Sequence, residues 1–106
     1  MRVKIPFSKD MARAVLAGKK TCATRNKRYG GMGDTFEVVA ALDYATCRIT
    51  NLARLTLGNV AFAFFAKEGF ESPDGFKKKW VQLHPVKGFE PDQLVWLHEF
   101  EVIEKP

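Results

Sequence analysis

Three segments with the composition of β-strands constrain the fold of this chain more than any other feature. They cover residues 35–40, 47–57 and 94–103, and each is rich in apolar residues, β-branched or aromatic ones among them. The second segment alternates imperfectly, which predicts a β-bulge. Residues 3–7 form a weaker fourth pattern, in which Pro6 favours an edge strand or a strand end. Short strands of this kind bury their apolar faces in a small curved sheet or barrel.

Short helices are expected between these strands. The patterns place them over residues 8–18, 58–68 and 72–85. Either Ser8 or Asp10 can cap the first helix, and a proline suited to a first helical turn opens the third. The sequence therefore predicts an α+β fold in which the helices are brief insertions.

The size of the chain predicts one domain, residues 1–106, because 106 residues suffice for a single core. A content of 46% hydrophobic and 12% aromatic residues excludes disorder. No apolar run approaches the roughly 18 residues that a membrane span needs. The first residues also lack the apolar stretch of a secretion signal. We therefore expect a cytoplasmic protein with no membrane partner.

Metal and cofactor sites are not expected. Cys22 and Cys47 stand 25 positions apart without a CxxC pair. His84 and His98 lie far from any cysteine pair and lack metal-ligand spacing. His98 alternates with Trp96 in the last strand segment, so we expect both in the core.

Positive charge is concentrated at the start of the chain. Residues 1–30 hold nine Lys and Arg against one acid, whereas residues 31–106 hold eight against eleven. The densest part is a segment that runs into a glycine-rich turn, with cations at Lys19, Lys20, Arg25, Lys27 and Arg28. Such asymmetry favours an anionic partner, most often nucleic acid or a phosphate-bearing ligand.

The segment Gly18-Lys19-Lys20-Thr21-Cys22-Ala23-Thr24-Arg25 resembles the signature of ASCH domains, written G-x-K-x-x-E/T-x-R. The surroundings agree over nearly the whole chain, with a preceding helix, a following Gly-Asp turn into a strand, a mid-chain Glu-Gly-Phe and a final aromatic strand. This resemblance implies a single ASCH domain with a PUA-like small β-barrel, short helices at one mouth, and a cleft for RNA or modified nucleosides.

The resemblance also points to an activity. Some bacterial relatives of similar length are amidohydrolases that remove the acetyl group from N4-acetylcytidine, with a lysine, a threonine and a glutamate proposed to carry the chemistry. The lysine falls on Lys20, and the glutamate on Glu68 or Glu71. The threonine position falls on Ala23, which has no hydroxyl. Thr24 is adjacent, but adjacent side chains on an extended backbone point to opposite faces.

Lys20 is a candidate general base, because neighbouring cations and burial both disfavour its charged form. Without a threonine, the remaining route is a water activated by Lys20, with Glu68 as general acid. The alternative for this pair is an ordinary salt bridge that shapes the cleft.

The other residues of the basic segment are candidates for contacts with nucleic acid. Arg25 can bind a phosphate or a base edge in a fixed geometry. Lys27 and Arg28 are expected to contact backbone phosphates or no ligand at all. Lys19 belongs to the same predicted nucleic-acid-binding set. Tyr29 offers a face on which a base can stack, or it covers the mouth of the barrel.

Three hypotheses for function follow. The first is an RNA- or nucleoside-binding domain that uses the segment from Lys19 to Tyr29. The second is a hydrolase of the same fold, either an acetylcytidine amidohydrolase or a ribonuclease, that uses Lys20 and Glu68. The third is a protein-interaction module with an acidic partner.

Overall fold

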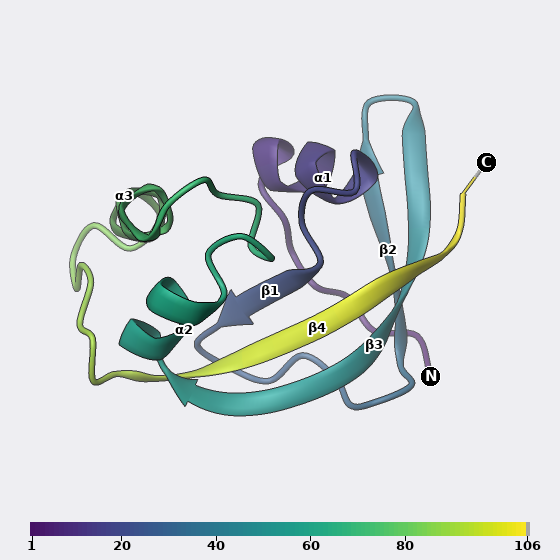
Figure 1. The fold of residues 1–106 in the computed structure, drawn as a ribbon. Coiled ribbons are helices and arrows are strands. Elements are labelled where there is room, and N and C mark those ends of the chain that lie inside the picture. Colours follow the sequence, from purple (N-terminus) through teal and green to yellow (C-terminus); the bar gives the residue numbers. More distant parts are fainter. Residues whose placement is uncertain (106) are drawn as a thin grey trace.

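The computed structural model describes residues 1–105 and forms a four-stranded antiparallel sheet with three short helices (Figure 1). Along the chain the elements are α1 (Lys9–Leu16), β1 (Cys22–Arg25), β2 (Thr35–Ala40), β3 (Asp43–Thr56), α2 (Leu57–Ala63), α3 (Pro73–Leu83) and β4 (Leu94–Glu104). The strands are ordered β1-β4-β3-β2, so that β1 and β2 form the two edges.

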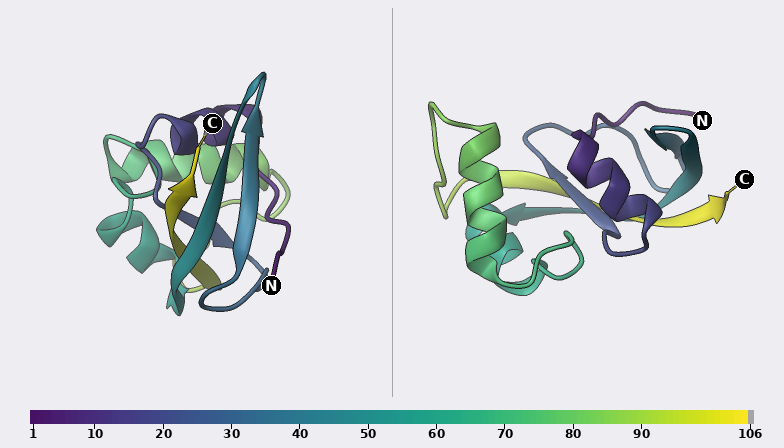
Figure 2. Two further views of the ribbon diagram at one scale, coloured as in Figure 1. Left: turned by 90° about the vertical axis from the view of Figure 1, so that its right-hand side faces the viewer. Right: turned by 90° about the horizontal axis from the view of Figure 1, so that it is seen from above.

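The sheet is curled into half of a barrel, and the fold is the predicted α+β type (Figure 2). The two central strands, β3 and β4, are long enough to run the length of the molecule, and they carry the curl. Their pairing shifts register between Ile49 and Asn51, which confirms the predicted bulge. A bulge increases the local twist of a strand pair, and this helps a small sheet to bend around its contents.

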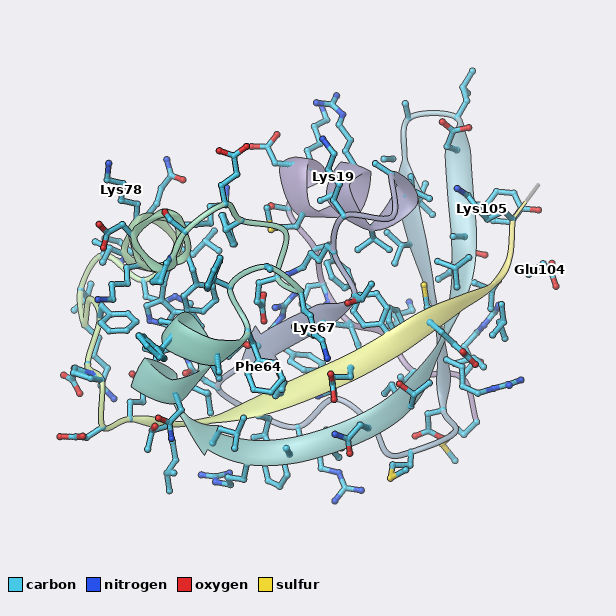
Figure 3. The ribbon with its side chains drawn as sticks, viewed as in Figure 1. Lys19, Phe64, Lys67, Lys78, Glu104 and Lys105 are labelled. Atoms are coloured by element: carbon cyan, nitrogen blue, oxygen red, sulfur yellow. The ribbon has the colours of Figure 1, made fainter. Side chains whose placement is uncertain are left out.

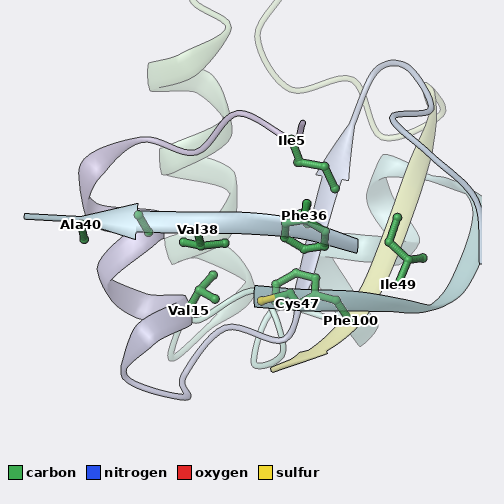
Figure 4. Close-up of a cluster of buried hydrophobic side chains, with 10 residues drawn as sticks. Ile5, Val15, Phe36, Val38, Ala40, Cys47, Ile49 and Phe100 are labelled. Atoms are coloured by element: carbon green, nitrogen blue, oxygen red, sulfur yellow. The ribbon is translucent and has the colours of Figure 1, made fainter. Parts of the chain in front are cut away.

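One hydrophobic cluster lies between α1, the N-terminal segment and the β2 half of the sheet (Figure 4). Its centre is Phe36, which is fully buried and packs edge-on against Phe100 with ring centroids 5.2 Å apart. Phe7 stacks on Phe36 from the N-terminal segment at 6.0 Å. Val15 closes the cluster from α1.

A second cluster lies under α2 and α3 at the other end of the sheet. Phe76 and Trp80 of α3 face Leu57 and Val60 of α2, and Leu97 of β4 lies in the same cluster. The two clusters occupy different parts of the sheet, so the region between them is bounded by α1 on one side and α3 on the other (Figure 1).

The helix boundaries follow from their caps. Ser8, rather than Asp10, caps α1, because its hydroxyl accepts the backbone N–H of Met11 at 3.3 Å. Ser72 caps α3 in the same way, accepting the N–H of Gly75 at 3.1 Å. The second helix is shorter than expected and ends at Ala63.

One expectation about strands was wrong. Residues 3–7 do not form a strand. In this region Arg2 makes an isolated bridge to Thr35, and Val3 donates one hydrogen bond to the Thr35 carbonyl at 2.8 Å. Pro6 has no N–H to extend such a ladder. In addition, four residues of the basic segment form β1, Cys22–Arg25, over which no strand was predicted. No helix among the described residues is long and apolar enough to cross a membrane.

Replacing Phe36 by alanine should lower the free energy of unfolding by about 3–5 kcal/mol, because the substitution leaves a cavity between the Phe7 ring, which stacks on Phe36, and the Phe100 ring, which packs edge-on against it. Urea unfolding followed by tryptophan fluorescence measures this. Leu42→Ala is the control, since Leu42 is exposed and its loss should change stability by less than about 0.5 kcal/mol. Equal losses in the two variants would contradict the assignment of Phe36 to the core.

Candidate functional site

A cavity of about 360 Å³ lies beyond the free edge of β1, between the start of α1 and one face of α3. Its volume falls in the range of small-molecule sites, which span roughly 300–1,000 Å³. Aromatic side chains form much of its wall, namely Phe7, Phe70, Phe76 and Trp80. Its polar lining consists of Ser8, Lys20, Thr24, Arg25, Glu68, Lys79 and His84.

The centre of the polar lining is a buried ion pair. The Lys20 ammonium lies 2.6 Å from Glu68 Oε1, and the two side chains are only 2% and 4% exposed. The ammonium also donates to the Glu68 backbone carbonyl at 3.2 Å. The expected pairing of Lys20 with a glutamate is thus present, and it uses Glu68, whereas Glu71 is exposed and does not line the cavity.

The second oxygen of Glu68 accepts two further groups. The Thr24 hydroxyl donates to Glu68 Oε2 at 2.5 Å, and the Cys22 thiol donates to the same atom at 3.4 Å. Both side chains are buried. One carboxylate therefore joins an ammonium and a hydroxyl on opposite oxygens, at the wall of a cavity of ligand size.

This geometry corrects the view that the site lacks a hydroxyl. Within β1, Cys22 and Thr24 share a face that turns toward Glu68, whereas Ala23 lies on the other face, in the cluster around Phe36. Adjacent side chains of β1 do point to opposite faces, as expected. The threonine role was assigned to Ala23, however, whereas Thr24 is the residue on the face toward Glu68. Lys20 precedes β1 and is outside its alternation, so its side chain need not share the face of Ala23.

The segment after α2 delivers Glu68 to this position. Glu68 donates its backbone N–H to the Phe64 carbonyl at 3.0 Å, and Thr21 donates to the Lys67 carbonyl at 2.7 Å. Gly69 follows with φ of 97°, a conformation that residues with a side chain rarely adopt. A Cβ on Gly69 would also come within 3.5 Å of the Lys20 side chain. The turn thus fixes the glutamate against the start of β1.

Arg25 lines the cavity as well, but its environment differs. Its guanidinium donates to two neutral carbonyls, those of Thr24 at 2.8 Å and Pro6 at 2.6 Å, and it lies over the Phe7 ring at 5.1 Å. Burial lowers the pKa of Arg25, because the charged guanidinium is withdrawn from water.

The rest of the basic segment does not line the cavity. Lys19 is exposed beside α1 (Figure 3), and Lys27 lies over the Tyr29 ring at 4.9 Å. Arg28 is exposed and donates to the Gly30 carbonyl at 2.7 Å. Tyr29 is half-buried against the first hydrophobic cluster. Only Lys20 and Arg25 of the five cations therefore meet at one site.

Cys22 contributes a buried thiol rather than an exposed nucleophile. Burial and the Glu68 charge raise its pKa far above the ordinary value, so the thiolate is strongly disfavoured. Within residues 1–105, no group of three or more His, Cys, Asp or Glu side chains is arranged to hold a metal ion.

His98 is fully buried on β4, behind β1. Its Nε2 accepts the Tyr29 backbone N–H at 3.1 Å, and its Nδ1 lies 3.1 Å from the Ala23 carbonyl. A carbonyl only accepts, so Nδ1 carries the proton and the ring is neutral. Burial lowers the pKa of His98. A proton added at Nε2 would also point at the Tyr29 backbone N–H, which donates to that atom in the neutral ring.

The fold itself has close counterparts among solved structures. The ASCH domain from Lactobacillus crispatus superposes with a TM-score of 0.68 at 17% identity, covering 95% of this chain and 79% of that one. ASCH from Zymomonas mobilis gives 0.67 at 13% identity, covering 98% and 69%. The chain has the ASCH fold.

A third similar structure is that of the hypothetical protein PH0355, with a TM-score of 0.72 at 15% identity over 97% of this chain and 100% of that one. No protein-family model and no curated protein matches the sequence. At these identities the likeness establishes the ASCH fold, as the resemblance of the Gly18–Arg25 segment implied, and the ligand has to be inferred from the site.

The neutral His98 makes stability depend on pH. In the unfolded chain the imidazole binds a proton near its ordinary pKa of 6.5, whereas the folded protein resists protonation. The free energy of unfolding should therefore fall as the pH drops below 6.5, until the lowered pKa of the folded state is reached. Urea unfolding at about pH 7.5 and about pH 5.5 tests this, and His98→Gln should show a smaller decline. An unchanged decline in that variant would assign the effect to other groups.

Proposed function

We propose that this ASCH-fold protein hydrolyses the amide of an acylated nucleoside, with N4-acetylcytidine as the reference substrate. The observation that supports the proposal is the Glu68 carboxylate, which accepts the Thr24 hydroxyl on one oxygen and the Lys20 ammonium on the other. A nucleophile joined to a base that a third group orients is the usual arrangement of covalent acyl transfer. The resemblance of the Gly18–Arg25 segment implies the same three residue types.

The reaction begins at Thr24. As its oxygen attacks the acetyl carbonyl carbon, its proton passes to Glu68 Oε2, the atom to which the hydroxyl already donates. The tetrahedral intermediate collapses by breaking the C–N bond, and Glu68 returns the proton to the departing nitrogen. Water then attacks the acetyl ester of Thr24, with Glu68 again accepting a proton. Acetic acid leaves, and the hydroxyl is restored.

Lys20 has a role beside this proton transfer. Two of its three N–H groups point to Glu68, to Oε1 and to the backbone carbonyl, which holds the carboxylate in place. The third can donate to the carbonyl oxygen as it becomes negative. In this scheme Glu68 takes the proton, because it is the group within hydrogen-bond reach of the hydroxyl. The assignment of Lys20 as general base with Glu68 as acid stays a prediction, and a pH–rate profile of Lys20→Arg separates the two schemes.

The cavity also suits the rest of such a substrate. Phe70, Phe76 and Trp80 provide apolar surface on which a pyrimidine ring can pack, and the volume accommodates a nucleoside rather than a folded nucleic acid. The catalytic groups lie in its wall, shielded from bulk water, and this strengthens the electrostatic stabilisation of a developing oxyanion.

Thr24→Val should lower kcat/KM for N4-acetylcytidine by about 10²–10⁴-fold, because it removes the nucleophile while keeping the shape of the side chain. Release of cytidine, followed by chromatography, measures the loss. Thr24→Ser should keep much of the activity, and Lys20→Ala should abolish it.

Thr21→Val is the matched control, because Thr21 lies in the same segment but is exposed. It should leave kcat/KM unchanged. Absence of cytidine release by the folded wild-type protein would contradict the proposed activity on this substrate, and equal losses in the Thr21 and Thr24 variants would remove Thr24 from the mechanism.

A second candidate function, RNA binding, is favoured by a separate surface. The exposed Arg54 and Arg28 guanidiniums lie over the half-buried Trp96 ring at 4.8 and 6.0 Å, and Lys27 lies nearby in sequence. Cations beside an aromatic face are typical of single-stranded RNA binding. None of these residues lines the cavity.

If Lys27, Arg28 and Arg54 meet the phosphates of a single strand, the logarithm of the binding constant should fall with the logarithm of salt concentration with a slope near −2. Fluorescence anisotropy with a labelled oligoribonucleotide measures the slope. Arg54→Ala should make it shallower, whereas Lys78→Ala on the outer side of α3 should not (Figure 3). A flat salt response would contradict phosphate binding by this surface.

A further inference from the structure

The charges around the cavity do not balance. Three cationic side chains line it, Lys20, Arg25 and Lys79, against a single carboxylate, that of Glu68. Lys20 and Glu68 neutralise each other across 2.6 Å. Two positive charges therefore remain, and the Thr24 hydroxyl lies in the same cavity wall.

Arg25 is one of these two charges. Its guanidinium reaches two neutral carbonyls and an aromatic ring, and it has no carboxylate partner among residues 1–105. Two of its five N–H groups are used by those carbonyls, which leaves others free to donate. A guanidinium that is partly withdrawn from water and lacks a counter-charge costs stability. Such a cost is expected where a ligand supplies the missing negative charge.

Lys79 is the other charge. Its side chain is 20% exposed, and its nearest acid is Asp10, whose carboxylate lies 3.9 Å away and is itself 72% exposed. A pair so open to solvent holds its partners weakly. The preceding residue on α3, Lys78, points away from the molecule (Figure 3). Of these two neighbours, the helix turns Lys79 toward the cavity.

We infer that the substrate carries an anionic oxyacid group, a phosphate or a carboxylate, which Arg25 and Lys79 bind while the amide lies at Thr24. The inference deepens the proposed function and rests on it. It follows from three neighbouring features of one cavity: two cations without an effective counter-charge, an aromatic wall, and the nucleophile with its carboxylate. A neutral nucleoside would satisfy the second and third features, but it would leave Arg25 without a counter-charge and Lys79 with only its solvent-exposed contact to Asp10.

The test measures binding and therefore does not depend on turnover. Isothermal titration at low salt compares cytidine 5′-monophosphate with cytidine, as the phosphate probe, and orotate with uracil, as the carboxylate probe. At least one charged probe should bind about tenfold or more tightly than its neutral counterpart, since hydrogen bonds to charged groups are the strong ones. Tighter binding of cytidine 5′-monophosphate than of cytidine identifies a phosphate as the bound group. Tighter binding of orotate than of uracil identifies a carboxylate.

Lys79→Met should reduce that preference severalfold and leave the affinity for the neutral member unchanged. Lys78→Met removes the same charge from the same helix and should leave the preference intact. The inference is wrong if neither charged probe binds better than its neutral counterpart, or if the two lysine variants lose the preference equally. Failure of the proposed function would show itself separately, as absence of acetyl release from every acylated substrate.

Discussion

The buried Glu68 carboxylate is the constraint on which the rest of the site depends. Its negative charge is buried away from water. The Lys20 ammonium, 2.6 Å from one carboxylate oxygen, compensates this charge, and the Thr24 hydroxyl donates to the other oxygen. Removing one partner of such a pair typically costs about 3–5 kcal/mol, because the remaining charge is left buried and alone. The pair thus ties the turn after α2 to the start of β1, and the same contacts that hold the fold also bring together the three groups of the proposed reaction.

The position of β1 explains why a cavity exists at this point. Its one edge pairs with β4, from Cys22 opposite Glu99 to Arg25 opposite Trp96, and its other edge has no strand beside it. Two clusters of apolar side chains hold α1 and α3 on either side of that free edge. Polar side chains from β1 and from the facing turn line the space between the two helices.

Much of the fold could be predicted from local patterns. The strand over Thr35–Ala40, the bulge in β3 and the cap at Ser72 follow from side-chain alternation and from the hydroxyl that a helix start requires. Local patterns did not predict two segments correctly: residues 3–7 were expected to form a strand and do not, whereas β1 was not expected and does. The first has strand composition, but it meets β2 only through the isolated bridge at Arg2 and the hydrogen bond from Val3 to Thr35. The second is too short for a strand pattern to show in its sequence, and it becomes a strand by pairing with β4.

The sequence by itself determined the α+β class and the concentration of positive charge, and it predicted the pairing of Lys20 with Glu68, because each is a matter of composition or of a short motif. Only the tertiary structure decided which hydroxyl joins them. Thr24 and Ala23 are adjacent in the chain, and which of them contacts the Glu68 carboxylate and which packs in the core depends on which face of β1 turns toward Glu68. The tertiary structure also gave the cations of the basic segment different surroundings: Lys20 is buried beside a carboxylate, whereas Arg25 has none as a partner among the described residues. The local sequence cannot show this, because Lys20 and its partner Glu68 are 48 positions apart in the chain.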